Sequence, residues 1–320
     1  MTTNQNQNLS VFITGANGGL GFETAKILLA SGVGRLALAT RKEAKAVQAR
    51  ARILDQVRAK GKVEAYGGFD MNDPKSIEDS VKRMPENKPF NVIFLQAGGV
   101  FFTDDYQFLN YGKKRLEKTV FQNAFGAYIT LVNLQKAGLV APNARVVFAG
   151  GEGARGIPGM IEKPVFLSYN SLKGYIEGSK DMPAYNPMNS IGISKLVSAL
   201  ISQKLSEIND GNEYIWFTPG LTHGTNGLKK VAPVKRFFME KVMFGMSAML
   251  GMSQSPKKGA EKYAECLLGE VGKNGDVLGA PEGKVLGKIT DQKPMNPSIR
   301  DRDLIDGIWR MVNEIYPRTA

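Results

Sequence analysis

The sequence predicts an α/β protein in which a doubly wound parallel sheet carries helices on both faces. Short apolar runs of the kind that form buried parallel strands alternate with segments of helical periodicity. The first run, residues 11–13, enters a glycine-rich turn, and a helical pattern follows from Glu23. A second strand pattern at Arg35–Ala39 completes a strand–helix–strand unit around that turn.

The glycine-rich turn has the composition that a phosphate group requires. Gly15, Gly19 and Gly21 follow the first strand at spacings of four and two residues. A pyrophosphate docks on a helix N-terminus where no Cβ blocks its approach and where free N–H groups point outward. A tight structural bend is the alternative interpretation of the same glycines. The candidate phosphate-binding residues are Thr14, Gly15, Asn17, Gly18, Gly19, Leu20 and Gly21.

The end of the second strand indicates which dinucleotide this turn would bind. NAD-binding folds place an acidic residue here to hold the ribose 2′-hydroxyl. This chain has Thr40, Arg41 and Lys42 instead. Two cations suit a 2′-phosphate, so the sequence favours NADP(H).

Other strands also end in candidate ligand-binding residues. The strand pattern at residues 62–69 leads into Asp70 and Met71, and Asp73 with Pro74 then predicts a helix start. The apolar run at residues 91–95 ends in Gln96, Ala97 and Gly98. Open α/β sheets bind ligands at the carboxyl ends of their strands. We therefore expect Asp70, Met71, Gln96, Ala97 and Gly98 on the adenosine side of the site.

The remaining pattern predicts one domain over residues 1–320. We expect a long helix at about residues 114–137, a strand at 145–149, an irregular insertion at 152–190, and a helix from about Ser190. A strand at 213–217 precedes a Met- and Phe-rich insertion at 225–255. The chain then predicts a helix through Cys266, a short β-like segment at 277–289, and a closing amphipathic helix at 302–315.

The chain is basic, and its charge bears on which partners it could bind. The net charge is +12, from 42 Lys and Arg against 30 Asp and Glu. The most basic stretch, residues 41–62, contains eight basic and two acidic residues, which predicts a solvated helix face. Nucleic-acid binding is the weaker alternative, because no aromatic residues for base stacking interleave with the charges.

Cysteine, histidine and apolar content bound the remaining classes. One cysteine, Cys266, and one histidine, His223, exclude an intramolecular disulfide and predict no Cys- or His-based metal site. The polar N-terminal residues and the lack of a membrane-length apolar run predict a soluble, cytoplasmic protein. We expect a monomer or a homodimer.

Together these motifs resemble the short-chain dehydrogenase/reductase superfamily over nearly the whole chain. The matching pieces are residues 14–21, Asp70–Met71, 96–98, 123–126, 194–196 and Pro219–Gly220. The segment after Gly220 and the final helix with Trp309 look most like protochlorophyllide reductases and retinol-dehydrogenase-like members. The resemblance implies a Rossmann-type sheet of about seven strands and an NAD(P)(H) cofactor. It also assigns Pro219, Gly220 and Thr222 to the cofactor site.

The resemblance further implies hydride transfer assisted by an Asn-Ser-Tyr-Lys tetrad. Asn123 and Lys195 match the asparagine and the lysine, and both are also expected beside the cofactor. The serine position falls at Gly150 and Gly151, and the tyrosine position four residues before Lys195 is Ile191. The tetrad is therefore incomplete. Losing the phenol removes a proton donor that contributes about 10²–10⁴ in rate.

Three arrangements offer a replacement for the missing phenol. Tyr169 and Lys173 repeat the tyrosine-to-lysine spacing of the family. Tyr185, in the loop before the helix, is a candidate to fold over the nicotinamide. His223 lies just after Pro219–Gly220, and its ordinary pKa of about 6.5 suits proton transfer near neutrality. Packing or surface roles are the alternative for each.

Two functional hypotheses follow. The first is an NADP(H)-dependent oxidoreductase that acts on a small hydrophobic substrate, a bulky apolar carbonyl or conjugated alkene, by an altered proton path. The second is a catalytically silent NADP(H)-binding protein that acts as a sensor or interaction partner. The Met-rich insertion at 225–255 would line a pocket, contact a partner or membrane surface, or pack against the protein body.

Overall fold

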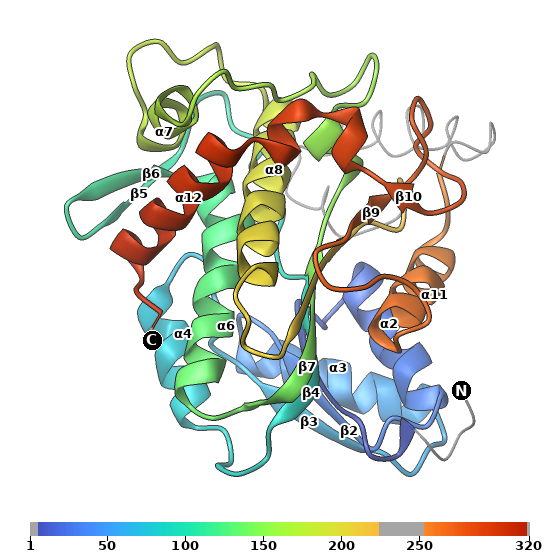
Figure 1. The fold of residues 1–320 in the computed structure, drawn as a ribbon. Coiled ribbons are helices and arrows are strands. Elements are labelled where there is room, and N and C mark those ends of the chain that lie inside the picture. Colours follow the sequence, from blue (N-terminus) through green and yellow to red (C-terminus); the bar gives the residue numbers. More distant parts are fainter. Residues whose placement is uncertain (1–5, 224–252, 319–320) are drawn as a thin grey trace.

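A computed structural model describes residues 6–223 and 253–318, and its centre is one eight-stranded sheet. The strand order is β10-β9-β8-β7-β4-β1-β2-β3, with helices on either side (Figure 1). Neighbouring strands are parallel except for β9 and β10. The predicted fold class is confirmed, with eight strands in place of about seven. The sheet strands are β1 (Ser10–Thr14), β2 (Arg35–Ala39), β3 (Lys62–Tyr66), β4 (Phe90–Leu95), β7 (Val140–Ala149), β8 (Glu213–Phe217), β9 (Val277–Gly279) and β10 (Thr290–Asp291).

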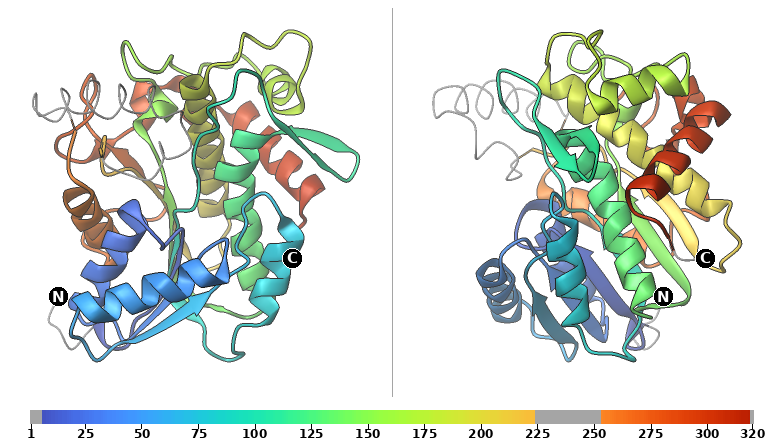
Figure 2. Two further views of the ribbon diagram at one scale, coloured as in Figure 1. Left: turned by 180° about the vertical axis from the view of Figure 1, so that it is seen from behind. Right: turned by 90° about the vertical axis from the view of Figure 1, so that its left-hand side faces the viewer.

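Helices cover both faces of the sheet because the middle of its central strands is apolar and buried on both sides. On one face lie α2 (Gly19–Ala30), α3 (Glu43–Gln56) and α11 (Pro256–Leu267), whose buried residues share one core cluster. The other face packs against α4 (Pro74–Lys82), α6 (Gly126–Lys136) and α8 (Pro187–Ser206). Figure 2 shows both helical layers from two further directions.

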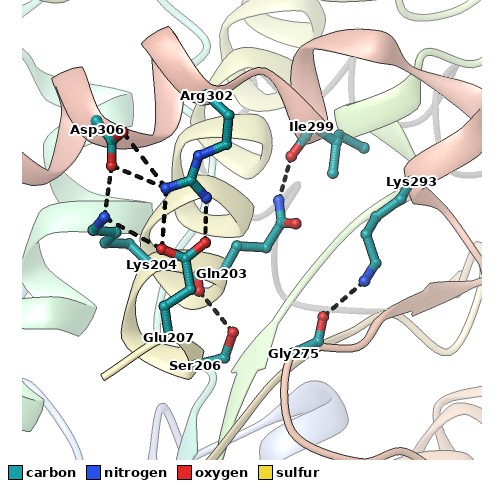
Figure 3. Close-up of polar contacts among 9 residues, drawn as sticks. All are labelled: Gln203, Lys204, Ser206, Glu207, Gly275, Lys293, Ile299, Arg302 and Asp306. Atoms are coloured by element: carbon teal, nitrogen blue, oxygen red, sulfur yellow. Dashed lines mark hydrogen bonds and ion pairs between the residues drawn. The ribbon is translucent and has the colours of Figure 1, made fainter. Parts of the chain in front are cut away.

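The closing helix α12 (Arg302–Ile315) forms an additional layer outside α6 and α8. Its apolar side is buried in the core of that face, and Trp309 meets Tyr128 of α6 edge-on at 5.9 Å between ring centroids. Figure 3 shows the charged residues that link its first turns to the end of α8. Lys204 of α8 and Glu207, the residue just after α8, pair there with Arg302 and Asp306 of α12.

The chain reverses its direction of winding beside β1, and this creates the site. Strands β2 and β3 extend from one side of β1, whereas β4, β7 and β8 extend from the other. The carboxyl ends of β1 and β4 are tied together by Thr14, whose hydroxyl oxygen accepts from the backbone N–H groups of Gln96 and Ala97 at 2.8 and 2.9 Å. Ligands of open α/β sheets bind at such a switch point.

Two predictions about the middle of the chain were wrong in part. The helix predicted at 114–137 begins only at residue 118, because residues 114–117 form strand β6 (Lys114–Glu117), paired with β5 (Phe108–Tyr111). The helical segment comprises α5 (Lys118–Val120), a π-helix (Phe121–Phe125) and α6. Gly112, with φ of +58°, turns the hairpin.

The insertion predicted as irregular at 152–190 contains a helix, α7 (Tyr169–Glu177), and a 3-10 turn at Glu152–Arg155. Ser168 accepts from the backbone N–H of Ser171 to cap α7, and Gly178 ends it in a left-handed conformation. Helix α8 starts at Pro187 rather than at Ser190, since Asn186 caps it. Further 3-10 turns lie at Lys293–Met295 and Pro297–Arg300. Most of the Met-rich segment 225–255 lies outside the described residues.

Two kinds of feature are missing from the part of the chain that the structure describes. No helix there is both long and apolar enough to cross a membrane. The same residues hold no group of three or more His, Cys, Asp or Glu side chains placed to bind a metal ion.

Candidate active site

A cleft of about 650 Å³ lies along the carboxyl edge of the sheet and collects most of the predicted cofactor residues. The turns after β1, β2 and β4, the end of β7 and the first half of α8 all contribute to it. The predicted residues that line it are Gly15, Asn17, Gly18, Gly19, Leu20, Thr40, Arg41, Lys42, Asp70, Met71, Gln96, Ala97, Gly98, Asn123 and Lys195.

The glycine turn leaves the start of α2 open to a ligand. Gly15 and Gly19 have φ values of +70° and +54°, the left-handed region that favours glycine. Helix α2 begins at Gly19 without a side-chain cap, so its first N–H groups are not satisfied by a side chain. A Cβ at Gly15 or Gly21 would lie 2.6 Å from the Gln96 amide. The backbone therefore forms a cradle that suits a phosphate.

Gln96 holds this cradle in place. With its side-chain nitrogen turned toward the carbonyl oxygens of Thr14 and Gly15, it donates to both, at 3.3 and 3.2 Å. Thr14 does not line the cleft itself but fixes the β1 and β4 ends on which the cradle rests.

The β2 end of the cleft is strongly cationic. Arg41 and Lys42 are exposed and line it, and Lys45 of α3 joins them. The nearby Glu43 carboxylate accepts from the Gly67 backbone N–H at 2.5 Å, on the side of β3. Counting Lys195, four cationic side chains line the cleft against one carboxylate, that of Asp70. This imbalance favours a polyanionic ligand.

Asn123 positions one wall of the cleft. Its amide nitrogen donates to the carbonyl oxygens of Gly99 and Thr119 at 2.7 and 2.8 Å, and its oxygen accepts from the Gly99 N–H at 3.0 Å. The residue lies in the π-helix, a form often found at functional sites. Both the oxygen and the nitrogen of its side-chain amide thus hold Gly99, in the loop after β4.

Lys195 presents an amine at the β7 end of the cleft. Its Nζ donates to the carbonyl oxygen of Ala149 at 2.7 Å, and no carboxylate among the described residues pairs with it. Burial of the amine lowers the pKa of Lys195 to about 8, although its stem borders the open cleft. Ile191 lines the cleft one helical turn earlier, where the family's phenol is expected.

The two glycines after β7 differ in the space that they leave. A Cβ at Gly150 would lie 2.6 Å from the Trp216 ring, so a serine does not fit there. At Gly151 the nearest atom to a Cβ would be Cγ of Lys195 at 3.3 Å. Gly151 is therefore the position at which a hydroxyl could be introduced beside the lysine.

The predicted replacements for the phenol lie outside the lining of the cleft. The Tyr185 hydroxyl donates to the carbonyl oxygen of Phe101, a lining residue, at 2.6 Å. Tyr185 thus stands behind the rim of the cleft. The His223 ring lies 3.0 Å from the Ser253 hydroxyl. Tyr169 packs against Gly307 and Arg310 of α12, and Lys173 pairs with Glu177, so this pair belongs to a different surface.

Pro219, Gly220 and Thr222 also lie outside the lining. The carbonyl oxygen of Pro219 accepts from Gln254 and Lys262, at 2.7 and 3.0 Å. The Thr222 hydroxyl donates to the Gly220 carbonyl oxygen at 3.1 Å. These three residues shape the turn after β8, next to the part of the chain that is not described.

A second cavity of about 650 Å³ lies by the loop after the 3-10 turn at Glu152–Arg155. Arg155 and Lys163 face Glu162 and Glu282 in its lining, so its charges balance. The Arg155 guanidinium donates to Gln292 and to backbone carbonyl oxygens. This cavity therefore lacks the cationic excess of the cleft.

Several lining residues escaped sequence reasoning. Lys45 belongs to the basic stretch that predicted a solvated face, and Val100 and Phe101 follow the Gln96 motif as an ordinary apolar pair. Tyr263 lines the cleft from α11, far along the chain. The apolar residues around Tyr263 have helical spacing, which predicts only that they pack in the core.

Part of this chain is similar to a known protein family. Residues 10–162 match the family described as short chain dehydrogenase. This match spans a little under half of the chain, and over these residues the chain is similar to short-chain dehydrogenases. The matched segment carries the superfamily's glycine turn, the strand end with Arg41 and Lys42, and Asn123. The finer resemblance to protochlorophyllide reductases is not part of this match.

Individual proteins are similar to this chain in sequence or in fold. "Short-chain dehydrogenase anuD" of Penicillium roqueforti is 31% identical over 42% of this chain, and the chain spans only 34% of that relative's length. A putative uncharacterized protein from Mycobacterium paratuberculosis has the same fold, with a TM-score of 0.64, 17% identity and coverage of 98% and 97% of the two chains. A short chain dehydrogenase from Burkholderia cenocepacia, solved in complex with NADP, has a TM-score of 0.55, 18% identity and coverage of 82% and 92%.

Proposed function

We propose that the protein is an NADP(H)-dependent oxidoreductase that acts on a bulky apolar carbonyl or conjugated alkene. The observation that carries this proposal is the cleft itself. An uncapped helix start stands beside two cations at the end of β2, and the Lys195 amine, which has no carboxylate partner among the described residues, lies at the β7 end. A superfamily relative of similar fold was solved with NADP.

The residues present fit the dinucleotide. The cradle at Gly15 and Gly19 would take the pyrophosphate, because both glycines have left-handed backbone and helix α2 starts there without a side-chain cap. Arg41 and Lys42 would hold a 2′-phosphate by charge-assisted hydrogen bonds. When bound, NADPH supplies a hydride. The protein's own residues bind and orient it and deliver the balancing proton.

The proton path is the part of the mechanism that departs from the family. Reduction of a carbonyl requires one proton on oxygen for each hydride on carbon, and neither Ile191 nor Gly151 carries one. Lys195 lines the cleft as a transferable acid with a pKa of about 8, so at neutral pH its ammonium form predominates. We place proton delivery on Lys195, directly or through a water, with Tyr185 and His223 as more distant sources.

The substrate side of the cleft is apolar. Val100, Phe101 and Ile191 line it around the amine. Such walls favour a bulky apolar compound over a sugar or a small acid, since a polar substrate would leave groups without hydrogen bonds. We therefore propose a small hydrophobic substrate.

A catalytically silent NADP(H)-binding protein is the second candidate. Isoleucine at position 191 favours it, because its side chain occupies the cleft one turn from Lys195 and cannot titrate. The two candidates share the cofactor and differ only in turnover.

Turnover separates the two candidates. We expect the purified protein to oxidise NADPH in the presence of some member of a panel of hydrophobic quinones, enones and aryl ketones. Lys195→Met should reduce kcat by about 10²-fold or more. A panel without any turnover, from a protein that binds NADPH, would favour the silent alternative.

Rebuilding the tetrad tests the alignment independently. The double variant Ile191→Tyr with Gly151→Ser should gain carbonyl reductase activity, because both positions face Lys195. Gly150→Ser is the matched control, since its Cβ would strike Trp216. If the double variant binds cofactor and gains no activity, the assignment of these positions is wrong.

A further inference from the structure

Tyr263 is a buried tyrosine that borders the cleft. It lies on α11 with 2% of its surface exposed, and it lines the cleft at the edge of the sheet. Its ring packs against Phe94 and Phe217, with ring centroids 4.6 and 5.4 Å away. These contacts fix the ring firmly but involve no polar atom.

The Tyr263 hydroxyl has no hydrogen-bond partner among the residues that the structure describes. Buried tyrosine hydroxyls normally find one. Two others in this protein do so: Tyr128 donates to Asn313 at 3.2 Å and Tyr214 to Asp210 at 2.6 Å. The Tyr263 hydroxyl is also not among the polar atoms that protein fully encloses without a partner. The open space beside Tyr263 is the cleft that it lines.

The order of the strands places Tyr263 along the cleft. Its two ring partners belong to β4 and β8, which lie on the opposite side of β1 from the β2 end with Arg41 and Lys42. A dinucleotide that sets its adenosine phosphate on those cations and its pyrophosphate on the glycine turn would extend its other half toward Tyr263.

We propose that the Tyr263 hydroxyl donates a hydrogen bond to the nicotinamide half of the bound dinucleotide. This inference rests on the proposed NADP(H) site and adds a binding residue from the last third of the chain. Burial raises the pKa of Tyr263 well above 10, so the hydroxyl keeps its proton as a donor throughout the neutral range.

Binding measurements with a whole and a half cofactor test the inference. Tyr263→Phe removes only the hydroxyl and keeps the ring packing. We expect it to weaken NADPH binding by about 3- to 10-fold in calorimetric titrations. Binding of adenosine 2′,5′-bisphosphate, which lacks the nicotinamide half, should stay unchanged. Arg41→Ala, in contrast, should weaken the binding of both ligands.

Thermal unfolding without ligand provides a readout that does not depend on binding. Because the hydroxyl has no partner among the described residues, Tyr263→Phe should leave the Tm of the free protein unchanged or raise it slightly, while reducing the shift produced by NADPH. Tyr128→Phe is the matched control: it loses a bond to Asn313, so its Tm should fall and its NADPH affinity should not.

Several outcomes would overturn the inference. Equal NADPH affinity in wild type and Tyr263→Phe would mean that the hydroxyl only meets solvent. An equal loss for both ligands would contradict the assignment to the nicotinamide half. In either of these cases, binding of adenosine 2′,5′-bisphosphate and NADPH by the wild type would still support the proposed NADP(H) site. A wild type that binds neither would remove the proposed function together with this inference.

Discussion

Lys195 and Ile191 define how this site differs from the family pattern. One helical turn separates them on α8, and both line the cleft. Where a phenol would share a proton with the amine, an apolar side chain stands instead. Within the described part of the chain the amine makes one hydrogen bond, to the Ala149 carbonyl oxygen, and its burial lowers its pKa to about 8.

The lowered pKa of Lys195 makes the stability of the protein depend on pH. Between about pH 8 and the ordinary lysine pKa of 10.5, the unfolded chain binds a proton that the folded protein has released. The free energy of unfolding therefore gains a contribution that rises with pH in this window. Since the stem of Lys195 borders an open cleft, we expect about 1–3 kcal/mol.

Urea unfolding of wild type and Lys195→Met at several pH values checks this prediction. The methionine variant removes the titrating group and retains the stem. Its stability relative to wild type should be greatest at pH 7 and should decline toward pH 10. A difference that does not change with pH would show that the amine has an ordinary pKa in the folded protein.

Sequence reasoning identified the residues that belong to contiguous motifs. Gly15, Arg41 and Asn123 all lie in the cleft, because a local motif fixes the backbone that carries them. Tyr263 was missed, because its position depends on packing between α11 and strands β4 and β8. No local pattern records such a contact.

At the scale of elements, a capping signal predicted the start of α4 and the amphipathic pattern predicted α12, whereas apolar periodicity failed at β6. Asp73 accepts from the Ser76 N–H at 3.0 Å and starts α4 as predicted, and α12 has the predicted bounds. The predicted helix wrongly includes β6, because Leu116 fits both the helical spacing and the alternation of a strand. Ser168 and Gly178 are typical helix-capping residues, so the sequence does carry a local signal for α7.

Apolar burial, rather than the ion pairs of Figure 3, is expected to hold α12 against α8. The side chains of Arg302 and Asp306 are 56% and 41% exposed, so water and salt weaken their attraction. Asp306→Asn should lower the free energy of unfolding by less than about 1 kcal/mol. Ile308→Ala, at a fully buried position, should cost about 2–5 kcal/mol.

Chemical denaturation at low salt and at 1 M salt measures both variants. The effect of Asp306→Asn should shrink at high salt, and that of Ile308→Ala should not. A larger loss from Asp306→Asn than from Ile308→Ala would mean that the charged network dominates the attachment of α12.

For the whole molecule, the order of the strands brings distant motifs to one edge. The glycine turn follows β1, the cations follow β2, and Lys195 lies on α8, which comes after β7. All three line one cleft. The sequence predicted this gathering because parallel strands share their carboxyl edge. It did not predict the antiparallel β10, whose two residues pair with β9 through Gly279 and Leu278 only in the folded chain.

The central claim is that this edge binds NADPH through a cradle of glycines and two cations. Equilibrium titrations with NADPH and NADH, followed by nicotinamide fluorescence, test it most directly. We predict that wild type binds NADPH at least about tenfold more tightly than NADH, and that Arg41→Ala with Lys42→Ala removes most of this preference. Equal affinity for the two cofactors would contradict the role of the cations, and binding of neither would contradict the cofactor site itself.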